Sequence, residues 1–77
     1  MKTVKIYSTP TCPYCIRLKD FLKSNNVEFE NIDVSADQAK AKEMVERSGQ
    51  MGVPVADIDG EIIVGFDRAR ISQALGI

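Results

Sequence analysis

The sequence predicts an α/β fold in which a mixed four-stranded sheet carries helices on both faces. Over residues 3–34, a strand-like segment, a helical segment and a second strand-like segment follow one another, and this spacing suits a parallel strand pair joined by a helical crossover. Further along the chain, Asp59 and Gly60 separate two strand-like segments, and this dipeptide is a strong signal for a β-hairpin turn. The predicted order is β-α-β-α-β-β-α, and we expect residues 1–77 to form a single domain.

The first half of the chain supplies the parallel strand pair. Residues 3–8 are rich in β-branched and aromatic side chains, which predicts a strand. A helical pattern begins at Pro13, whose missing N–H is not needed in the first turn of a helix, and Asn25 and Asn26 end it. Residues 27–34 have the pattern of a second strand. The predicted apolar face of the helix contains Leu18, Phe21 and Leu22.

The second half of the chain supplies a helix, the hairpin and a last helix. Ser35 and Asp37 are candidate N-caps of the second helix, and Gly49 is its predicted stop. The hairpin strands lie within residues 53–64, and Asp67 is the candidate N-cap of the last helix. The inward faces of these two helices are predicted to carry Ala41, Met44, Val45, Ser48, Ile71, Ala74 and Leu75.

The composition excludes several classes of protein. Ten Lys and Arg residues against eleven Asp and Glu residues give a formal net charge of −1, whereas nucleic-acid-binding domains normally have a clear basic excess. The same balance leaves no polybasic patch for a membrane surface, and no apolar run approaches the roughly 20 residues that span a bilayer. The N-terminal residues lack the apolar stretch of a signal peptide. We therefore expect a cytoplasmic monomer without nucleic-acid or membrane partners.

Cys12 and Cys15 are the only cysteines, and the chain contains no histidine. The stabilisation that a disulfide provides grows with the length of the loop that it closes. A bond between two cysteines only three positions apart is therefore a poor structural staple. This argument favours a chemical role for the pair over a role in stability.

The position of the pair at a predicted helix start indicates thiol chemistry. Cys12 falls where the unpaired N–H groups of Tyr14 and Cys15 and the positive end of the helix dipole stabilise a thiolate and lower its pKa. Cys15 lies one turn inside the helix, closer to the core, and is expected to keep its proton longer. Pro13 stiffens the turn, and Tyr14 offers an aromatic wall beside Cys12.

Two other interpretations of the pair stay open. Two nearby cysteines can be small buried hydrophobic residues, and two chains that each offer one Cys-x-x-Cys pair can share a zinc ion or an iron–sulfur cluster. Zinc prefers four ligands, whereas one chain has two sulfurs and no imidazole to offer. A redox pair beside a β-α-β pattern is favoured over both, and we expect no metal site.

Three motifs resemble the glutaredoxin family: STPTCPYC at 8–15, MGVPV at 51–55 and VGFD at 64–67. The resemblance covers essentially the whole chain and implies a thioredoxin-like three-layer fold. It implies a small dithiol thiol–disulfide oxidoreductase that reduces protein or glutathione mixed disulfides, with Cys12 as the nucleophile and Cys15 as the resolving thiol. No cofactor is expected to be tightly bound, and glutathione is the implied co-substrate.

Val53 and Pro54 resemble the cis-proline loop of this family, which faces the active site. Only about 5–6% of X–Pro bonds in folded proteins are cis, so the residues alone favour a trans bond and the resemblance alone implies a cis one. The substrate-binding residues that the resemblance implies are Pro13, Tyr14, Val53, Pro54, Gly65, Phe66 and Asp67.

Three positions depart from the pattern of glutathione-dependent members. Thr9 stands where many glutaredoxins carry a basic residue that pairs with the thiolate and with a glutathione carboxylate. Phe66 is bulky where the family gives access to the backbone, and Arg68 replaces a small or acidic residue. Gly65-Phe66 resembles instead the redoxins that serve ribonucleotide reductase and receive electrons from thioredoxin reductase. The expected partners are therefore disulfide-containing proteins together with either glutathione or a thioredoxin-reductase-type flavoprotein.

Several further side chains have structural interpretations. Met44 and Tyr7 are expected to pack in the core, and Lys19 is expected on a solvated helix face. Arg47 and Gln50 could reach a substrate carboxylate at the edge of the groove, or point into water.

Overall fold

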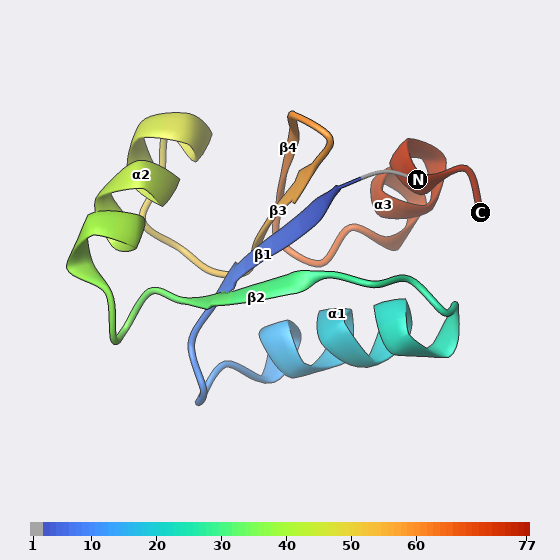
Figure 1. Ribbon diagram of the computed structural model, residues 1–77, viewed down its shortest axis with the longest axis horizontal. Helices are drawn as coiled ribbons and strands as arrows, with labels where there is room; N and C mark the ends of the chain where they lie inside the picture. The colour runs from blue at the N-terminus through green and yellow to red at the C-terminus, as the bar shows by residue number, and fades with distance from the viewer. Residues whose placement is uncertain (1–2) are drawn as a thin grey trace.

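A computed structural model of the protein describes residues 3–77 and contains one mixed sheet with three helices. The order along the chain is the predicted β-α-β-α-β-β-α, and the strands lie in the order β2-β1-β3-β4 (Figure 1). The elements are β1 Val4–Ser8, α1 Pro13–Ser24, β2 Glu30–Asp33, α2 Gln38–Ser48, β3 Val55–Ile58, β4 Glu61–Val64 and α3 Arg68–Leu75.

Strand β1 lies in the middle of the sheet and fixes its register. It pairs in parallel with β2, where Tyr7 faces Ile32, and antiparallel with β3, where Tyr7 faces Val55. Strands β3 and β4 form the antiparallel hairpin. Asp59 and Gly60 both have positive φ, 53° and 97°, as the two central residues of a type I′ turn require. The hairpin prediction is confirmed.

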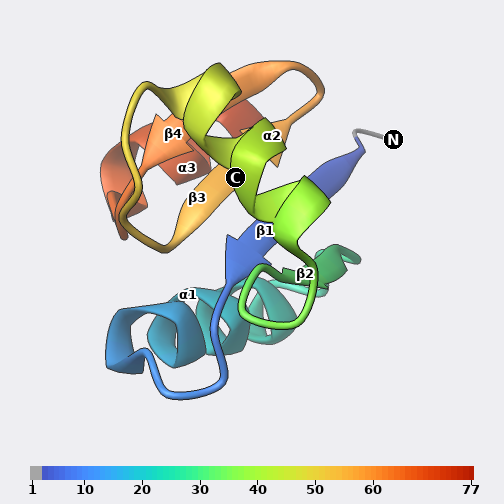
Figure 2. The same ribbon diagram turned by 90° about the vertical axis from the view of Figure 1, so that its left-hand side faces the viewer.

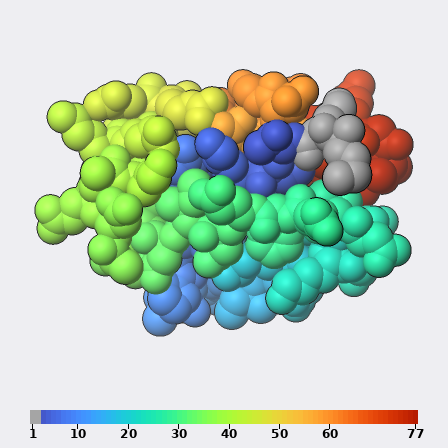
Figure 3. Space-filling view, in the orientation of Figure 1, coloured from blue at the N-terminus to red at the C-terminus, as the bar shows by residue number. Residues whose placement is uncertain are grey.

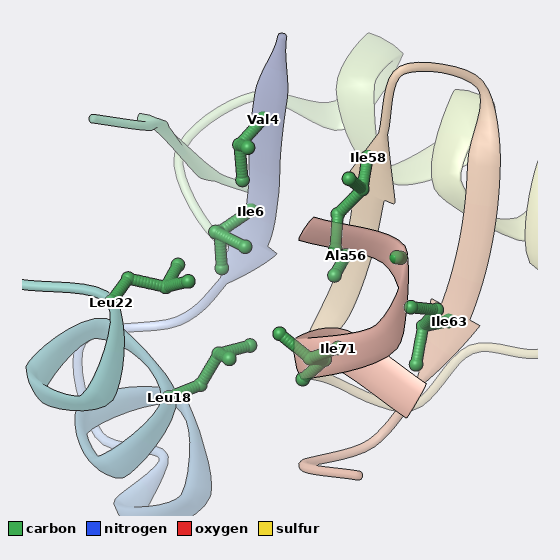
Figure 4. Close-up of a cluster of buried hydrophobic side chains, with 9 residues drawn as sticks. Val4, Ile6, Leu18, Leu22, Ala56, Ile58, Ile63 and Ile71 are labelled. Carbon is green, nitrogen blue, oxygen red and sulfur yellow. The ribbon is translucent and has the colours of Figure 1, made fainter. Parts of the chain in front are cut away.

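Alternation along the strands sorts the core into two clusters, one on each face of the sheet. The larger cluster packs β1, β3 and β4 against α1 and α3, and its side chains point toward one another in Figure 4. The smaller cluster packs Tyr7, Ile32 and Val55 against Met44 of α2. Figure 2 shows α1 and α2 on opposite sides of the sheet. The members of the larger cluster are Val4, Ile6, Leu18, Leu22, Ala56, Ile58, Ile63, Ile71 and Ala74.

Strand β2 is shorter than residues 27–34, the range that the sequence predicts. After α1, Asn26 takes a positive φ of 57°, and the backbone N–H of Val27 donates back to the carbonyl of Leu22 at 2.9 Å. This hydrogen bond is the C-terminal helix cap of the Schellman type, and it uses residues that would otherwise begin the strand. Val27 and Phe29 still pack against the larger cluster, so their apolar character reflects burial outside a strand.

The caps of α2 and α3 are aspartates. Asp37 accepts from the backbone N–H of Lys40, and Asp67 accepts from that of Arg70, each at 3.1 Å. Ser35 is not a cap, because its hydroxyl and its N–H both donate to Asp33. Asp37 alone therefore begins α2.

An ion pair joins the end of α2 to the sheet. Arg47 donates to the carboxylate of Asp57, which is buried on β3 and also accepts from the backbone N–H of Gly60. On the same side of the sheet, the buried hydroxyl of Tyr7 donates to Glu43 at 2.8 Å. These contacts fix α2 just before the segment 49–54. Within residues 3–77, no helix is long and apolar enough to cross a membrane.

Candidate active site

The two cysteines lie where β1 passes into α1. The backbone N–H of Cys12 donates to the carbonyl of Thr9 at 3.4 Å, which turns the chain, and Cys12 is the N-cap of α1 with Pro13 as the first helical residue. Figure 3 shows this blue segment at the surface, at one end of the molecule. The predicted helix start is thus confirmed, and the sulfur of Cys12 lies at the positive end of the helix dipole.

The environment of Cys12 favours its thiolate. The sulfur is half-buried and accepts a hydrogen bond from the backbone N–H of Cys15 at 3.3 Å. Burial raises the pKa of Cys12, but hydrogen bonds from the Cys15 side chain and from the backbone N–H groups of Cys15 and Tyr14 outweigh it, and the net pKa is lowered. These are the donors that the sequence predicts for a cysteine at a helix start.

The environment of Cys15 favours its thiol. Its side chain is fully buried, and burial together with the hydrogen bond to Cys12 raises the pKa of Cys15 to about 11. The negative charge of a Cys12 thiolate raises this pKa further, while the backbone of Thr9 lowers it. At neutral pH, therefore, one sulfur of the pair is poised to ionise and the other is not.

A second segment meets Cys12 from α2 and β3. The Val53–Pro54 peptide bond is cis, as the resemblance implies. The carbonyl oxygen of Val53 lies 3.9 Å from the Cys12 sulfur, and the carbonyl of buried Pro54 accepts from the backbone N–H of Gly65 at 2.8 Å. Backbone from segments 9–12, 49–54 and 64–66 is thus brought together around one sulfur.

The other residues that the resemblance implies are spread around this centre. Tyr14 is 58% exposed beside Cys12, and the guanidinium of Arg17 lies over its ring. The ring of Phe66 packs against Phe21 of α1 and the larger core cluster, with ring centroids 5.9 Å apart. Its bulk is therefore largely engaged by the core. Asp67 uses its carboxylate to cap α3.

Two basic side chains differ from their expected surroundings. Lys19 is half-buried, and its positive charge lowers the pKa of Cys12, of Cys15 and of Asp33, so it faces the cysteine pair and the end of β2 as well as solvent. Its spacing of seven from Cys12 puts both on one flank of a helix and could have indicated this. Arg47, a candidate for reaching a substrate carboxylate, is instead paired with Asp57.

The donor set was also searched for a metal centre. Within the part of the chain that the structure describes, no three Cys, His, Asp or Glu side chains come close enough together to hold a metal ion.

Comparisons with known proteins agree with this geometry. A model of the Glutaredoxin family matches residues 4–63. The chain is 50% identical over 72 residues to an uncharacterized glutaredoxin-like 8.6 kDa protein in the rubredoxin operon of Clostridium pasteurianum, a match that covers 94% of this chain and 96% of that protein. It is 43% identical over 76 residues to glutaredoxin 3 of Escherichia coli K12, covering 99% of this chain and 92% of that protein.

Solved structures give the same result for the fold. The thioredoxin-like protein BC3987 superposes with a TM-score of 0.92 at 38% identity and covers 100% of this chain and 99% of that one. The glutaredoxin from Archaeoglobus fulgidus superposes with a TM-score of 0.88 at 26% identity, covering 97% and 87%. With a family match over most of its length and relatives of this kind at both levels, the chain belongs to the glutaredoxin family of thiol–disulfide oxidoreductases.

Proposed function

We propose that the protein reduces disulfides of proteins, or mixed disulfides with glutathione, with Cys12 as the nucleophile and Cys15 as the resolving thiol. One observation carries this assignment: the Cys12 sulfur accepts the backbone N–H of Cys15 at the N-cap of α1, while the Cys15 sulfur is buried and holds its proton. A nucleophilic thiolate and a protonated second thiol are what a two-step disulfide exchange requires.

In the first step the Cys12 thiolate attacks one sulfur of the substrate disulfide. A bond forms between the Cys12 sulfur and that sulfur, the substrate S–S bond breaks, and the other substrate sulfur leaves as a thiolate that takes a proton from water. The protein and one half of the substrate are then joined by a mixed disulfide.

In the second step Cys15 attacks the Cys12 sulfur. The Cys15 thiol loses its proton, its sulfur bonds to that of Cys12, and the remaining substrate half leaves as a thiol. The Cys12 side chain and its charge both raise the pKa of Cys15 in the reduced protein. Both contributions diminish once Cys12 is bonded to the substrate, so formation of the mixed disulfide itself eases ionisation of the resolving thiol.

The cis-proline segment supplies a means of aligning the substrate. The Val53 carbonyl is 3.9 Å from the Cys12 sulfur and half-buried, so an extended substrate segment could pair with this backbone as an added strand. In this proposal Val53 and Pro54 orient the substrate, and Pro13 and Tyr14 line the approach to Cys12. Gly65, Phe66 and Asp67 form the far side of the groove.

The electron donor is the finer part of the proposal. Glutathione is the co-substrate that the motif Cys-Pro-Tyr-Cys favours, and a flavoprotein of the thioredoxin-reductase type is the competitor. Thr9 supplies no positive charge for a glutathione carboxylate, and the carboxylate of Asp67 is engaged as a helix cap. We propose glutathione-linked activity that is present but weak. A reductant of this kind works in a reducing compartment, which supports a cytoplasmic setting.

The test is a side-by-side assay of the oxidised protein. One arm supplies glutathione, glutathione reductase and NADPH, and the other supplies thioredoxin reductase and NADPH, with NADPH consumption as the readout. We expect turnover in at least one arm, none with Cys12→Ser, and a trapped mixed disulfide with Cys15→Ser by mass spectrometry. Turnover by Cys12→Ser at the parent rate would reject the assignment of the nucleophile.

A further inference from the structure

Two arginines of the α1 and α3 layer have aromatic rings as partners. The guanidinium carbon of Arg17 lies 5.3 Å from the ring centre of Tyr14, and that of Arg68 lies 5.2 Å from the ring centre of Phe21. Among residues 3–77, no carboxylate lies within ion-pair distance of either arginine, whereas Arg47 and Lys40 on the other face are paired. Both charges therefore remain available to a partner.

These four residues, Tyr14, Arg17, Phe21 and Arg68, form what we name the arginine–aromatic row. Tyr14, Arg17 and Phe21 are spaced by three and four positions along α1, so they lie on one flank of the helix. Arg68 reaches the same flank from the first turn of α3, and Phe66 supports the Phe21 ring from below. The row begins at Tyr14, two residues from Cys12, and extends about 10 Å along the helix axis.

The charge distribution of the whole chain gives the row its sign. Helices α1 and α3 with their caps carry five basic residues against Asp20 and Asp67, a net charge of +3, so the rest of the chain carries −4. A protein that is nearly neutral overall therefore has a positive layer, and Cys12 lies at the N-terminus of a helix in this layer. Stacking on a ring also holds each guanidinium in place while its N–H donors stay free at the rim.

Resting on the proposed function, we infer that the arginine–aromatic row binds an acidic segment that flanks the cysteine of a protein disulfide while Cys12 attacks it. A length of about 10 Å corresponds to roughly three residues of extended chain. The preferred substrate thus carries Asp or Glu within about three residues of its reactive cysteine. Guanidinium groups bind carboxylates through paired N–H donors, which gives the acidic segment a fixed position as well as attraction.

The test compares three synthetic peptides that differ only in the residues flanking a single cysteine, each supplied as its disulfide-linked homodimer. The flanks carry Glu, Gln or Lys at the same positions. The reduced protein is mixed with each peptide in the absence of any electron donor, and the rate constant for formation of peptide thiol is measured. We expect the Glu peptide to react about three- to tenfold faster than the Gln peptide at low salt, and the Lys peptide more slowly than both.

Two variants and one condition make the result specific to the row. Arg17→Gln combined with Arg68→Gln is expected to bring the Glu-to-Gln ratio close to one, as is salt of about 1 M. Arg70→Gln removes a charge from the same helix layer without an aromatic contact, and it is expected to keep the ratio.

Each outcome has a distinct meaning. Equal rates for the Glu and Gln peptides, or an equal loss of the ratio in Arg70→Gln, would overturn the role of the row while leaving disulfide reduction intact. Failure of the folded parent to reduce any of the three peptides would reject the proposed function itself. Tight binding of a single-stranded oligonucleotide that the double variant abolishes, without a peptide preference, would assign the row to nucleic acid instead.

Discussion

The backbone N–H of Cys15 donates to the sulfur of Cys12 at 3.3 Å, so the helical turn that carries one cysteine stabilises the thiolate of the other. The same turn buries the Cys15 sulfur, and burial raises the pKa of that thiol to about 11. One short segment therefore separates the acidities of two chemically identical groups. This separation makes the order of their reactions testable.

Alkylation is expected to follow that order. Iodoacetamide reacts with thiolates, and at pH 7 a thiol whose pKa is about 11 has only about one molecule in ten thousand ionised. Because the pKa of Cys12 is lowered, its labelling should be faster than that of Cys15 at every pH below 9, and it should reach its plateau at lower pH than a free cysteine does. Mass spectrometry of the labelled peptides measures both rates. Faster labelling of Cys15 would reverse the assigned roles.

The stability of the reduced protein should fall in alkaline solution because of Cys15. Its pKa is about 11 in the folded protein against 9.0 for the free group, so the folded state holds this proton more tightly than the unfolded state. The stabilisation is complete below about pH 9 and is lost as the pH rises through 11, with a total of about 2–3 kcal/mol. Urea unfolding of the reduced protein at a series of pH values measures it.

Two variants separate Cys15 from the other group that titrates in this range. Cys15→Ala should flatten the decline, because the alanine variant has no thiol to ionise. Burial, together with the hydrogen bond to Glu43, also raises the pKa of Tyr7, so Tyr7→Phe reports the share of that phenol. If Cys15→Ala loses as much stability as the parent between pH 9 and 11, the cysteine is not responsible.

Local signals explain how much of this fold the sequence predicts. Asp37 and Asp67 cap helices, Asp59-Gly60 forms the hairpin turn and Cys12 begins α1, each because the residue acts on backbone groups within three positions of itself. The end of β2 could not be predicted in the same way. Val27 is apolar in either setting, and only the αL conformation of Asn26 decides that it joins a helix cap.

The site was predicted where it depends on α1 and not where it depends on distant segments. The lowered pKa of Cys12 follows from its place at a helix start. The inward turn of the Phe66 ring requires Phe21 of α1 to lie across from it, and the pairing of Arg47 requires Asp57 of β3. Contacts of this kind join residues at least ten positions apart, and a single sequence carries no signal for them.

The ion pair between Arg47 and Asp57 is expected to contribute measurably to stability. Asp57 is buried and has two hydrogen-bonded partners, so Asp57→Asn leaves the guanidinium of Arg47 without its charged partner. We expect a loss of about 1–3 kcal/mol in the free energy of unfolding, less than for a fully buried pair because Arg47 is partly exposed. Lys40→Gln breaks the exposed pair with Glu43 and should cost under about 0.5 kcal/mol. Equal effects of the two substitutions in urea unfolding would contradict this ranking.

The glutathione pocket should respond to a charge at position 9 rather than to a smaller residue at position 66. Phe66 packs against Phe21 and the larger core cluster, so Phe66→Gly would remove a core contact and confuse binding with stability. Thr9 is half-buried beside Cys12, and its backbone carbonyl, which the Cys12 N–H uses, is unaffected by a change of side chain. Thr9→Lys is therefore the cleaner substitution.

Thr9→Lys is expected to raise glutathione-dependent turnover about tenfold or more in kcat/KM. A hydrogen bond to a charged group contributes about 1.5–3 kcal/mol, and each 1.4 kcal/mol is a factor of ten. The coupled assay with glutathione reductase measures the change, and Ser24→Lys, which adds the same charge at the far end of α1, should leave it near the parent value. The alkylation rate of Cys12 in Thr9→Lys distinguishes the two ways in which the lysine can act: a faster rate indicates a more ionised thiolate, whereas an unchanged rate with a lower KM for glutathione indicates a carboxylate contact. Unchanged turnover in Thr9→Lys, with a parent that is already fast, would mean that the missing charge never limits the use of glutathione.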